Sequence, residues 1–161
     1  MKLTIAFFAT LLLAFAQTPH TATPGPYRAD ADARKDLAAA QGRARADRKF
    51  VMVIFGANWC EDCRVLHRSL DSPEVRGYAE SHFEVVSVDI GDDGKKNGDV
   101  AQNLGVSLDK GVPAAAFFAW DGTPVGRTNS GELEPSRNYK PAQILRFLQQ
   151  IVDHQKITTP K

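Results

Sequence analysis

The stretch Phe50-Val51-Met52-Val53-Ile54-Phe55-Gly56-Ala57-Asn58-Trp59-Cys60-Glu61-Asp62-Cys63 decides how this chain folds. Its first six residues are apolar and rich in β-branched side chains, which is typical of a strand buried on both faces. Gly56 ends that run, and a helix is expected from Cys60 to Leu70. One face of this helix has residues at i, i+3, i+4 and i+7 spacing: Cys63, Leu66, His67 and Leu70. The two cysteines therefore fall where a buried strand gives way to a helix.

Hydrophobic periodicity and turn residues predict further elements around this stretch. In chain order they are a helix over 30–47 capped by Asp30 or Asp32, a helix to about 81 opened by Ser72-Pro73-Glu74, a strand over 83–90, a helix capped by Asp99 and ending at Gly105, strands over 114–120 and 124–128 joined at Asp121-Gly122, and a helix over 141–155. Alternating helices and strands followed by a hairpin predict an α/β fold, a central mixed sheet with helices on both faces.

The first residues have the features of a secretory signal peptide. Lys2 is positive, 5–15 is an almost unbroken apolar run, and Ala14-Phe15-Ala16 has the small-x-small form of a cleavage site. A run of about 11 residues is too short to span a bilayer as a helix, which needs roughly 20. An uncleaved anchor or a buried helix stays open as the alternative. We therefore expect an exported protein, periplasmic or extracellular after cleavage.

The remaining chain divides into a short leader, one domain and a tail. Residues 17–29 contain three prolines and a glycine among small polar residues, which predicts a flexible N-terminal segment. Residues 30–156 are expected to form the domain, and 157–161 a C-terminal tail. The formal net charge of the 161 residues is +1, so composition does not indicate a nucleic-acid partner.

Cys60 and Cys63 are the only cysteines, so they form the one possible intramolecular disulfide. An exported protein works in an oxidising compartment, where disulfides persist. The pair is poorly suited to a structural role. A disulfide that closes a four-residue loop stabilises a protein by about 2 kcal/mol, whereas one that closes a 100-residue loop contributes about 4.7 kcal/mol. The spacing therefore favours a redox-active pair.

These residues resemble the thioredoxin-like family over about 30–155. The resemblance depends on the strand followed by Trp59-Cys60-Glu61-Asp62-Cys63, on Val112-Pro113 before a strand and a hairpin turn, and on the amphipathic last helix. The local sequence around the cysteines is also similar to that of the C-terminal domain of the bacterial transmembrane thiol–disulfide reductase. The resemblance implies a thioredoxin fold and thiol–disulfide exchange.

The resemblance also implies roles for individual residues. Cys60, at a helix N-terminus that stabilises a thiolate, would be the nucleophile, and Cys63 the resolving thiol. Trp59 would offer a flat apolar surface at the mouth of the site. Val112 and Pro113 would bind substrate, with a cis peptide bond between them.

Two departures from the family concern proton transfer. The family often has a buried acid six residues before the first cysteine, where this chain has Ile54, and a lysine that would align near Ser87. Proton transfer from Cys63 must then use water, Glu61 or His67. His67 shares a helix face with Cys63 and has an ordinary pKa suited to neutral pH; a histidine at the helix surface is the alternative.

The acidic pair Glu61-Asp62 bears on the direction of the reaction. Negative charge near a sulfur disfavours the thiolate, which favours a reducing couple unless solvent screens both carboxylates. We therefore predict an extracytoplasmic enzyme that reduces or isomerises protein disulfides. Its partners would be disulfide-containing proteins and a dithiol electron-donor protein. A membrane-bound donor is one option. No nucleotide or flavin motif is present, so no cofactor is expected.

Two other functions are compatible with the sequence. Cys60, Cys63 and His67, with His82 or His154, could bind a metal, although zinc usually has two spaced ligand pairs; two soft sulfurs also suit copper. The fold could instead serve as a non-catalytic protein-binding module. Metal analysis of the purified protein tests the first alternative, and loss of biological activity in Cys60→Ser argues against the second.

Overall fold

Strand β1 (Phe50–Gly56) lies inside a four-stranded mixed sheet in the computed structural model, which describes residues 25–153 and 160. It pairs in parallel with β2 (Phe83–Asp89) and antiparallel with β3 (Ala114–Phe118). Strand β4 (Pro124–Arg127) pairs with β3, so the strand order is β2-β1-β3-β4. The predicted mixed sheet and closing hairpin are confirmed.

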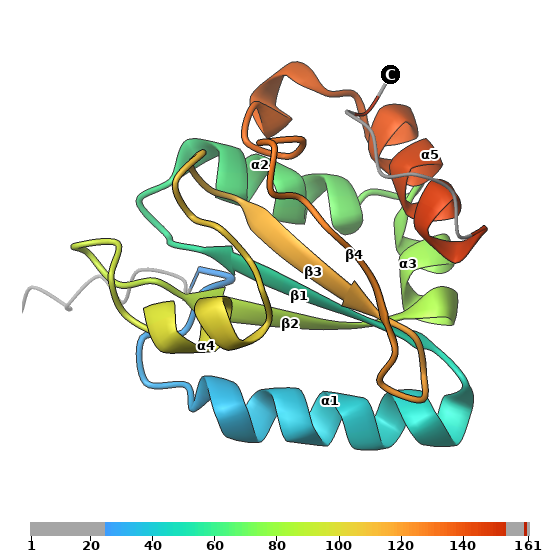
Figure 1. Ribbon diagram of the computed structural model, residues 1–161. Helices are drawn as coiled ribbons and strands as arrows, with labels where there is room; N and C mark the ends of the chain where they lie inside the picture. The colour runs from blue at the N-terminus through green and yellow to red at the C-terminus, as the bar shows by residue number, and fades with distance from the viewer. Residues whose placement is uncertain (1–24, 154–159, 161) are drawn as a thin grey trace, which may run out of the picture.

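Helices cover both faces of this sheet (Figure 1). They are α1 (Ala33–Asp47), α2 (Glu61–Leu70), α3 (Arg76–His82), α4 (Gly98–Asn103) and α5 (Pro141–Val152), with a 3-10 helix, η1 (Ser136–Asn138), before α5. Helices α2, α3 and α5 lie on one face, and α1 and α4 on the other. This arrangement is the thioredoxin fold.

Side chains along β1 alternate between two cores, which is why the whole strand is apolar. Met52 and Ile54 pack under α2, α3 and α5. Val51, Val53 and Phe55 pack under α1 and α4. Because both faces of β1 are covered, the turn that follows it has a rigid base.

Two predicted helix starts differ from the structure. Ser72 does not cap the third helix, because its hydroxyl donates to the Ser69 carbonyl at the end of α2, and α3 begins only at Arg76. Asp99 is not a cap either: Asn97, with φ 57°, precedes α4, and Asp99 lies in the first turn of α4 and pairs with Arg34.

The first helix follows one of its two predicted caps. The Asp32 carboxylate accepts hydrogen bonds from the backbone N–H groups of Arg34 and Lys35, at 3.1 Å each, so Asp32 and not Asp30 is the cap.

Some predictions concern residues that the structure does not describe. The predicted signal peptide, 1–16, lies outside the described residues, as does the predicted tail apart from residue 160. In the described part, no helix has both the length and the apolar character that crossing a bilayer requires.

Candidate active site

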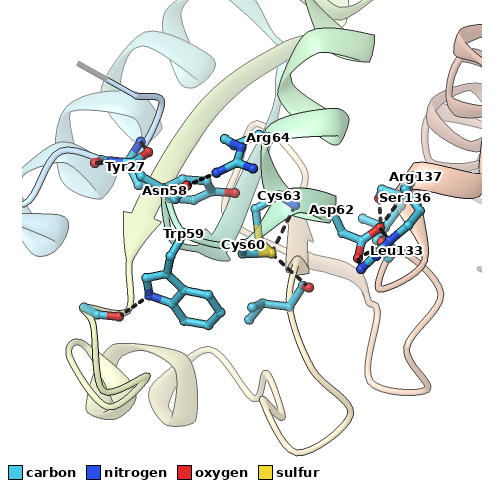
Figure 2. The surroundings of a disulfide bond; sticks show 12 residues. Tyr27, Asn58, Trp59, Cys60, Asp62, Cys63, Arg64, Leu133, Ser136 and Arg137 are labelled. Carbon is cyan, nitrogen blue, oxygen red and sulfur yellow. Dashed lines mark hydrogen bonds and ion pairs between the residues drawn. A yellow bond between two sulfur atoms is a disulfide. The ribbon is translucent and has the colours of Figure 1, made fainter. Parts of the chain in front are cut away.

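Cys60 and Cys63 lie at the start of α2, joined by a disulfide (Figure 2). Cys60 is the N-cap of α2, with extended backbone angles, and its Sγ accepts a hydrogen bond of 3.1 Å from the backbone N–H of Cys63. A helix N-terminus presents unpaired N–H groups and the positive end of its dipole. Both effects stabilise negative charge on the sulfur of Cys60.

The two sulfurs differ in access. Cys60 keeps 7% of its surface exposed, whereas Cys63 keeps none and lies in the core beneath α2. An incoming substrate can therefore reach only Cys60 without rearrangement of the core.

A second segment, just before β3, faces the disulfide. The Val112–Pro113 peptide bond is cis, as predicted, and the carbonyl oxygen of Val112 lies 3.4 Å from Cys60 Sγ. Pro113 is buried, and Val112 packs against both cores. The backbone of Val112 is therefore beside the accessible sulfur.

Trp59 lies at the protein surface, next to Cys60 in the chain. Its side chain is half exposed, and its Nε1–H donates a 3.0 Å hydrogen bond to the Gly91 carbonyl in the loop after β2. A cavity of about 340 Å³ beside the ring is lined by residues that include Asp92 and Lys96. The hydrogen bond holds the indole in place, so the ring offers an ordered apolar surface next to Cys60.

Of the acidic pair before Cys63, Asp62 is buried and Glu61 is exposed, so the alternative that solvent screens both carboxylates does not hold for Asp62. The Asp62 carboxylate accepts two kinds of hydrogen bond from Arg137 of η1. The backbone N–H of Arg137 donates to Asp62 Oδ1 at 2.8 Å, and its Nε–H donates to the same oxygen at 3.1 Å. Burial alone would raise the pKa of Asp62, but the hydrogen bonds and charge of Arg137 outweigh it and lower the pKa.

Arg137 also forms an ion pair with the carboxylate of Glu61. Its Nη1 lies 3.6 Å from Glu61 Oε2, and both of these side chains are more than half exposed. One guanidinium therefore offsets much of the negative charge near the sulfurs. The electrostatic argument for a strongly reducing couple is weaker than the sequence implies.

His67 is partly buried and turned toward the sheet, so it is not an ordinary surface histidine. Its ring meets the Tyr27 ring edge-on at 5.1 Å between centroids, and its Nε2 lies 3.2 Å from Ser87 Oγ. Burial lowers the pKa of His67, and the nearby Asp71 only partly opposes that effect. Burial therefore favours the neutral form of the imidazole.

Tyr27 was placed by the sequence in a flexible segment, and the structure corrects that prediction for this residue. Its side chain is fully buried, and its backbone is clamped by the side chain of Asn58 (Figure 2). The N–H of Tyr27 donates to Asn58 Oδ1 at 3.1 Å, and its carbonyl accepts from Asn58 Nδ2 at 2.6 Å. A lone aromatic among prolines was the only signal of this contact in the sequence.

The metal-binding alternative has no geometric support in the described chain. Among residues 25–153 and 160, no three histidine, cysteine, aspartate or glutamate side chains are grouped to hold a metal ion. His67 contacts Tyr27 and Ser87 instead.

A buried strand that delivers a Cys-x-x-Cys pair to a helix N-terminus, opposite a cis-proline, is the architecture of thiol–disulfide oxidoreductases with the thioredoxin fold. The sequence agrees, because it matches the thioredoxin-like protein family over residues 32–119, more than half of the chain. The chain belongs to the thioredoxin-like family.

Solved structures agree with this assignment. The chain is 33% identical to a disulphide isomerase from Xylella fastidiosa Temecula1, with a TM-score of 0.75, covering 81% of this chain and 99% of that one. A thioredoxin from Thermus thermophilus is 25% identical, with a TM-score of 0.50 and coverage of 74% and 82%.

A third structure shares the fold alone. The DsbH oxidoreductase is 19% identical, with a TM-score of 0.52 and coverage of 87% and 93%. A comparison with curated protein sequences found no match. The family, the fold and the Cys-x-x-Cys pair together make this protein a thiol–disulfide oxidoreductase.

Proposed function

We propose that this protein reduces or isomerises disulfides of other proteins outside the cytoplasm, with Cys60 as nucleophile and Cys63 as resolving thiol. One observation carries the proposal. Cys60 Sγ accepts a hydrogen bond from the Cys63 N–H at 3.1 Å and lies 3.4 Å from the Val112 carbonyl oxygen. An activated sulfur therefore lies next to a backbone segment with which an extended peptide can pair.

The reaction proceeds by two exchanges. The Cys60 thiolate attacks one sulfur of a substrate disulfide, and the other substrate sulfur leaves as a thiolate that takes up a proton from solvent. Cys63, deprotonated, then attacks Cys60 Sγ and releases the second substrate sulfur. The substrate gains two electrons and two protons, and the enzyme keeps the Cys60–Cys63 disulfide. In isomerisation, another thiolate of the substrate instead attacks the substrate sulfur of the mixed disulfide, which forms a new substrate disulfide and releases Cys60 as a thiolate.

Substrate binding is assigned to three residues around Cys60. Trp59 contributes an apolar ring whose orientation is fixed by Gly91. Val112 contributes backbone polar groups next to the sulfur, and the buried Pro113 follows it. We expect an extended, disulfide-containing protein segment to pair with this backbone.

His67 is the better of the two candidate proton acceptors. Burial lowers the pKa of His67 and so favours the neutral imidazole, the form that can accept a proton, whereas Glu61 is exposed and lies beside Arg137. A His67→Ala variant is expected to shift the pH–rate profile of the resolving step. An unchanged profile would exclude the role.

Export and an electron donor complete the proposal. The signal-like residues 1–16 and the similarity to a disulphide isomerase support an extracytoplasmic enzyme. A second dithiol protein, met at the membrane, would return the disulfide to the dithiol. Sequencing the N-terminus of the exported protein tests this: we expect Gln17 first, and a retained Met1 would contradict export by cleavage.

The decisive measurement is the reduction potential of the Cys60–Cys63 couple, obtained by equilibrating the protein against glutathione. A value near about −250 mV or lower supports a reductant, about −180 mV an isomerase, and about −120 mV a donor of disulfides, which would contradict the proposal. Cys60→Ser is the matched control and should neither exchange nor reduce insulin. Cys63→Ser should instead accumulate the mixed disulfide with substrate.

A further inference from the structure

The hydroxyl of Tyr27 is a buried polar group that the exchange mechanism described above does not use. The side chain is 1% exposed, and among the described residues its hydroxyl oxygen has no hydrogen-bond partner. Buried hydroxyl groups are nearly always hydrogen-bonded, and leaving one unpaired is costly. Such a group calls for a partner that another state of the protein supplies.

The resolving cysteine, Cys63, borders the same space as this hydroxyl. If Gly56 had a Cβ, that atom would lie 2.5 Å from the Tyr27 oxygen and 2.8 Å from Cys63 Sγ. The hydroxyl and the sulfur therefore both border the space above Gly56, at the end of β1, and only a residue without a side chain leaves room for both.

The position of Tyr27 is held from several directions. Asn58 clamps its backbone with two hydrogen bonds, and the His67 ring packs edge-on against its ring. Burial raises the pKa of Tyr27, so the phenol keeps its proton at any pH at which the enzyme works. Tyr27 is therefore a hydrogen-bond donor here and not a base.

We propose that the Tyr27 hydroxyl donates a hydrogen bond to Cys63 Sγ in the reduced protein and so stabilises the resolving thiolate. This takes the place of the buried acid that the family often has at the position of Ile54, by donation instead of proton transfer. The inference depends on the resolving role of Cys63 under Proposed function.

The redox state decides whether the hydroxyl has a partner. In the disulfide, Cys63 Sγ is uncharged and bonded to Cys60, so it is a poor acceptor. Reduction by a donor dithiol brings two electrons and two protons and leaves Cys63 as a thiol or thiolate. When Cys63 resolves a mixed disulfide, its proton leaves to a base or to solvent, the sulfur attacks Cys60, and Tyr27 retains its own proton throughout.

The test is Tyr27→Phe, which removes one oxygen and keeps the ring. Without the donor the reduced form loses stabilisation, so the equilibrium with glutathione should move about tenfold toward the disulfide, a potential lower by about 30 mV. Tyr78→Phe in α3 makes the same chemical change where the ring stacks on His82, and it should leave the potential unchanged.

A second readout separates this role from a merely structural one. Urea denaturation of both redox forms should show that Tyr27→Phe lowers the free energy of unfolding of the reduced protein, while the oxidised protein is unchanged or more stable. Resolution of the mixed disulfide should also require a higher pH in the variant. If Tyr27 had only a structural role, the substitution would destabilise the reduced and oxidised forms equally and leave the reduction potential unchanged.

The outcomes are distinct. Two results would overturn the inference while the proposed function stands. One is an equilibrium constant with glutathione for Tyr27→Phe within twofold of the wild-type value. The other is equal destabilisation of both redox forms. If the wild-type protein does not exchange with glutathione at all, the proposed function fails, and this inference fails with it.

Discussion

Asp62 and Glu61 are neighbours of the same charge, yet they occupy opposite environments. Asp62 is buried and bonded to both the backbone and the side chain of Arg137, while Glu61 is exposed. The helix period turns adjacent residues by about 100°, so one carboxylate faces η1 and the other solvent. Arg137 thus determines how much of this acidic charge the sulfur of Cys60 experiences.

The lowered pKa of Asp62 makes stability depend on pH. An unfolded aspartate has a pKa of about 3.9, and the folded value is lower, so the contribution is complete above that range and is lost as pH falls through the folded pKa. We expect Asp62→Asn to be less stable than wild type at pH 7, with the difference shrinking in acid. Urea denaturation from pH 7 to pH 2 measures it.

The matched control for this prediction is Asp36→Asn, an exposed aspartate in α1. Its difference from wild type should be small at pH 7. A constant deficit for Asp62→Asn across the whole pH range would mean that the ion pair with Arg137 does not contribute.

At the scale of elements, the end of β1 must be glycine because three parts of the molecule converge there. The strand brings Gly56 against both the Tyr27 hydroxyl and Cys63 Sγ, in the same layer as α2. Gly42 is different, since nothing lies within 4 Å of the position its Cβ would take. The two glycines therefore predict opposite effects of the same substitution.

We expect Gly56→Ala to lower the free energy of unfolding by about 1–3 kcal/mol, because the added methyl group overpacks the core. Gly42→Ala should raise it by about 0.5–1 kcal/mol, because alanine is the better helix former in the middle of α1. Chemical denaturation of both variants tests the pair. Equal effects of the two substitutions would contradict the crowding at Gly56.

At the scale of the whole molecule, the site is assembled from segments far apart in the chain. Tyr27 comes from before α1, Asn58 from the turn after β1, Val112 from the residues before β3, and Arg137 from η1. The turn that contains the cysteines is therefore supported on several sides, which keeps the helix N-terminus aligned with the cis-proline.

Loss of the Asn58 clamp should loosen the N-terminal segment. Asn58→Ala removes both hydrogen bonds to Tyr27, so we expect a loss of roughly 1–2 kcal/mol in the free energy of unfolding. Hydrogen exchange of the Tyr27 amide should also become faster. Asn103→Ala, at the exposed end of α4, is the control and should leave that amide protected.

The sequence predicted the strands, most helices and the redox pair because these have local signals. A short, continuous apolar run rich in β-branched residues is typical of a strand covered on both faces, and a stripe at helical spacing is typical of a helix with one core below it. Helix starts at Ser72 and Asp99 were wrong because other bonds used their side chains: a local hydrogen bond to Ser69 at the end of α2, and a tertiary ion pair with Arg34.

What the sequence by itself determined is the mixed α/β sheet, the position of Cys60 and Cys63 at a strand-to-helix junction, and, through the family resemblance, the cis bond before Pro113. Only the tertiary structure decided that Arg137 offsets Asp62 and that Tyr27 and Cys63 both pack around Gly56. The physical reason is separation along the chain. Local patterns encode which face of an element is apolar, but a polar contact between distant segments leaves no periodic trace, since one arginine or tyrosine can be buried or exposed according to what folds beside it.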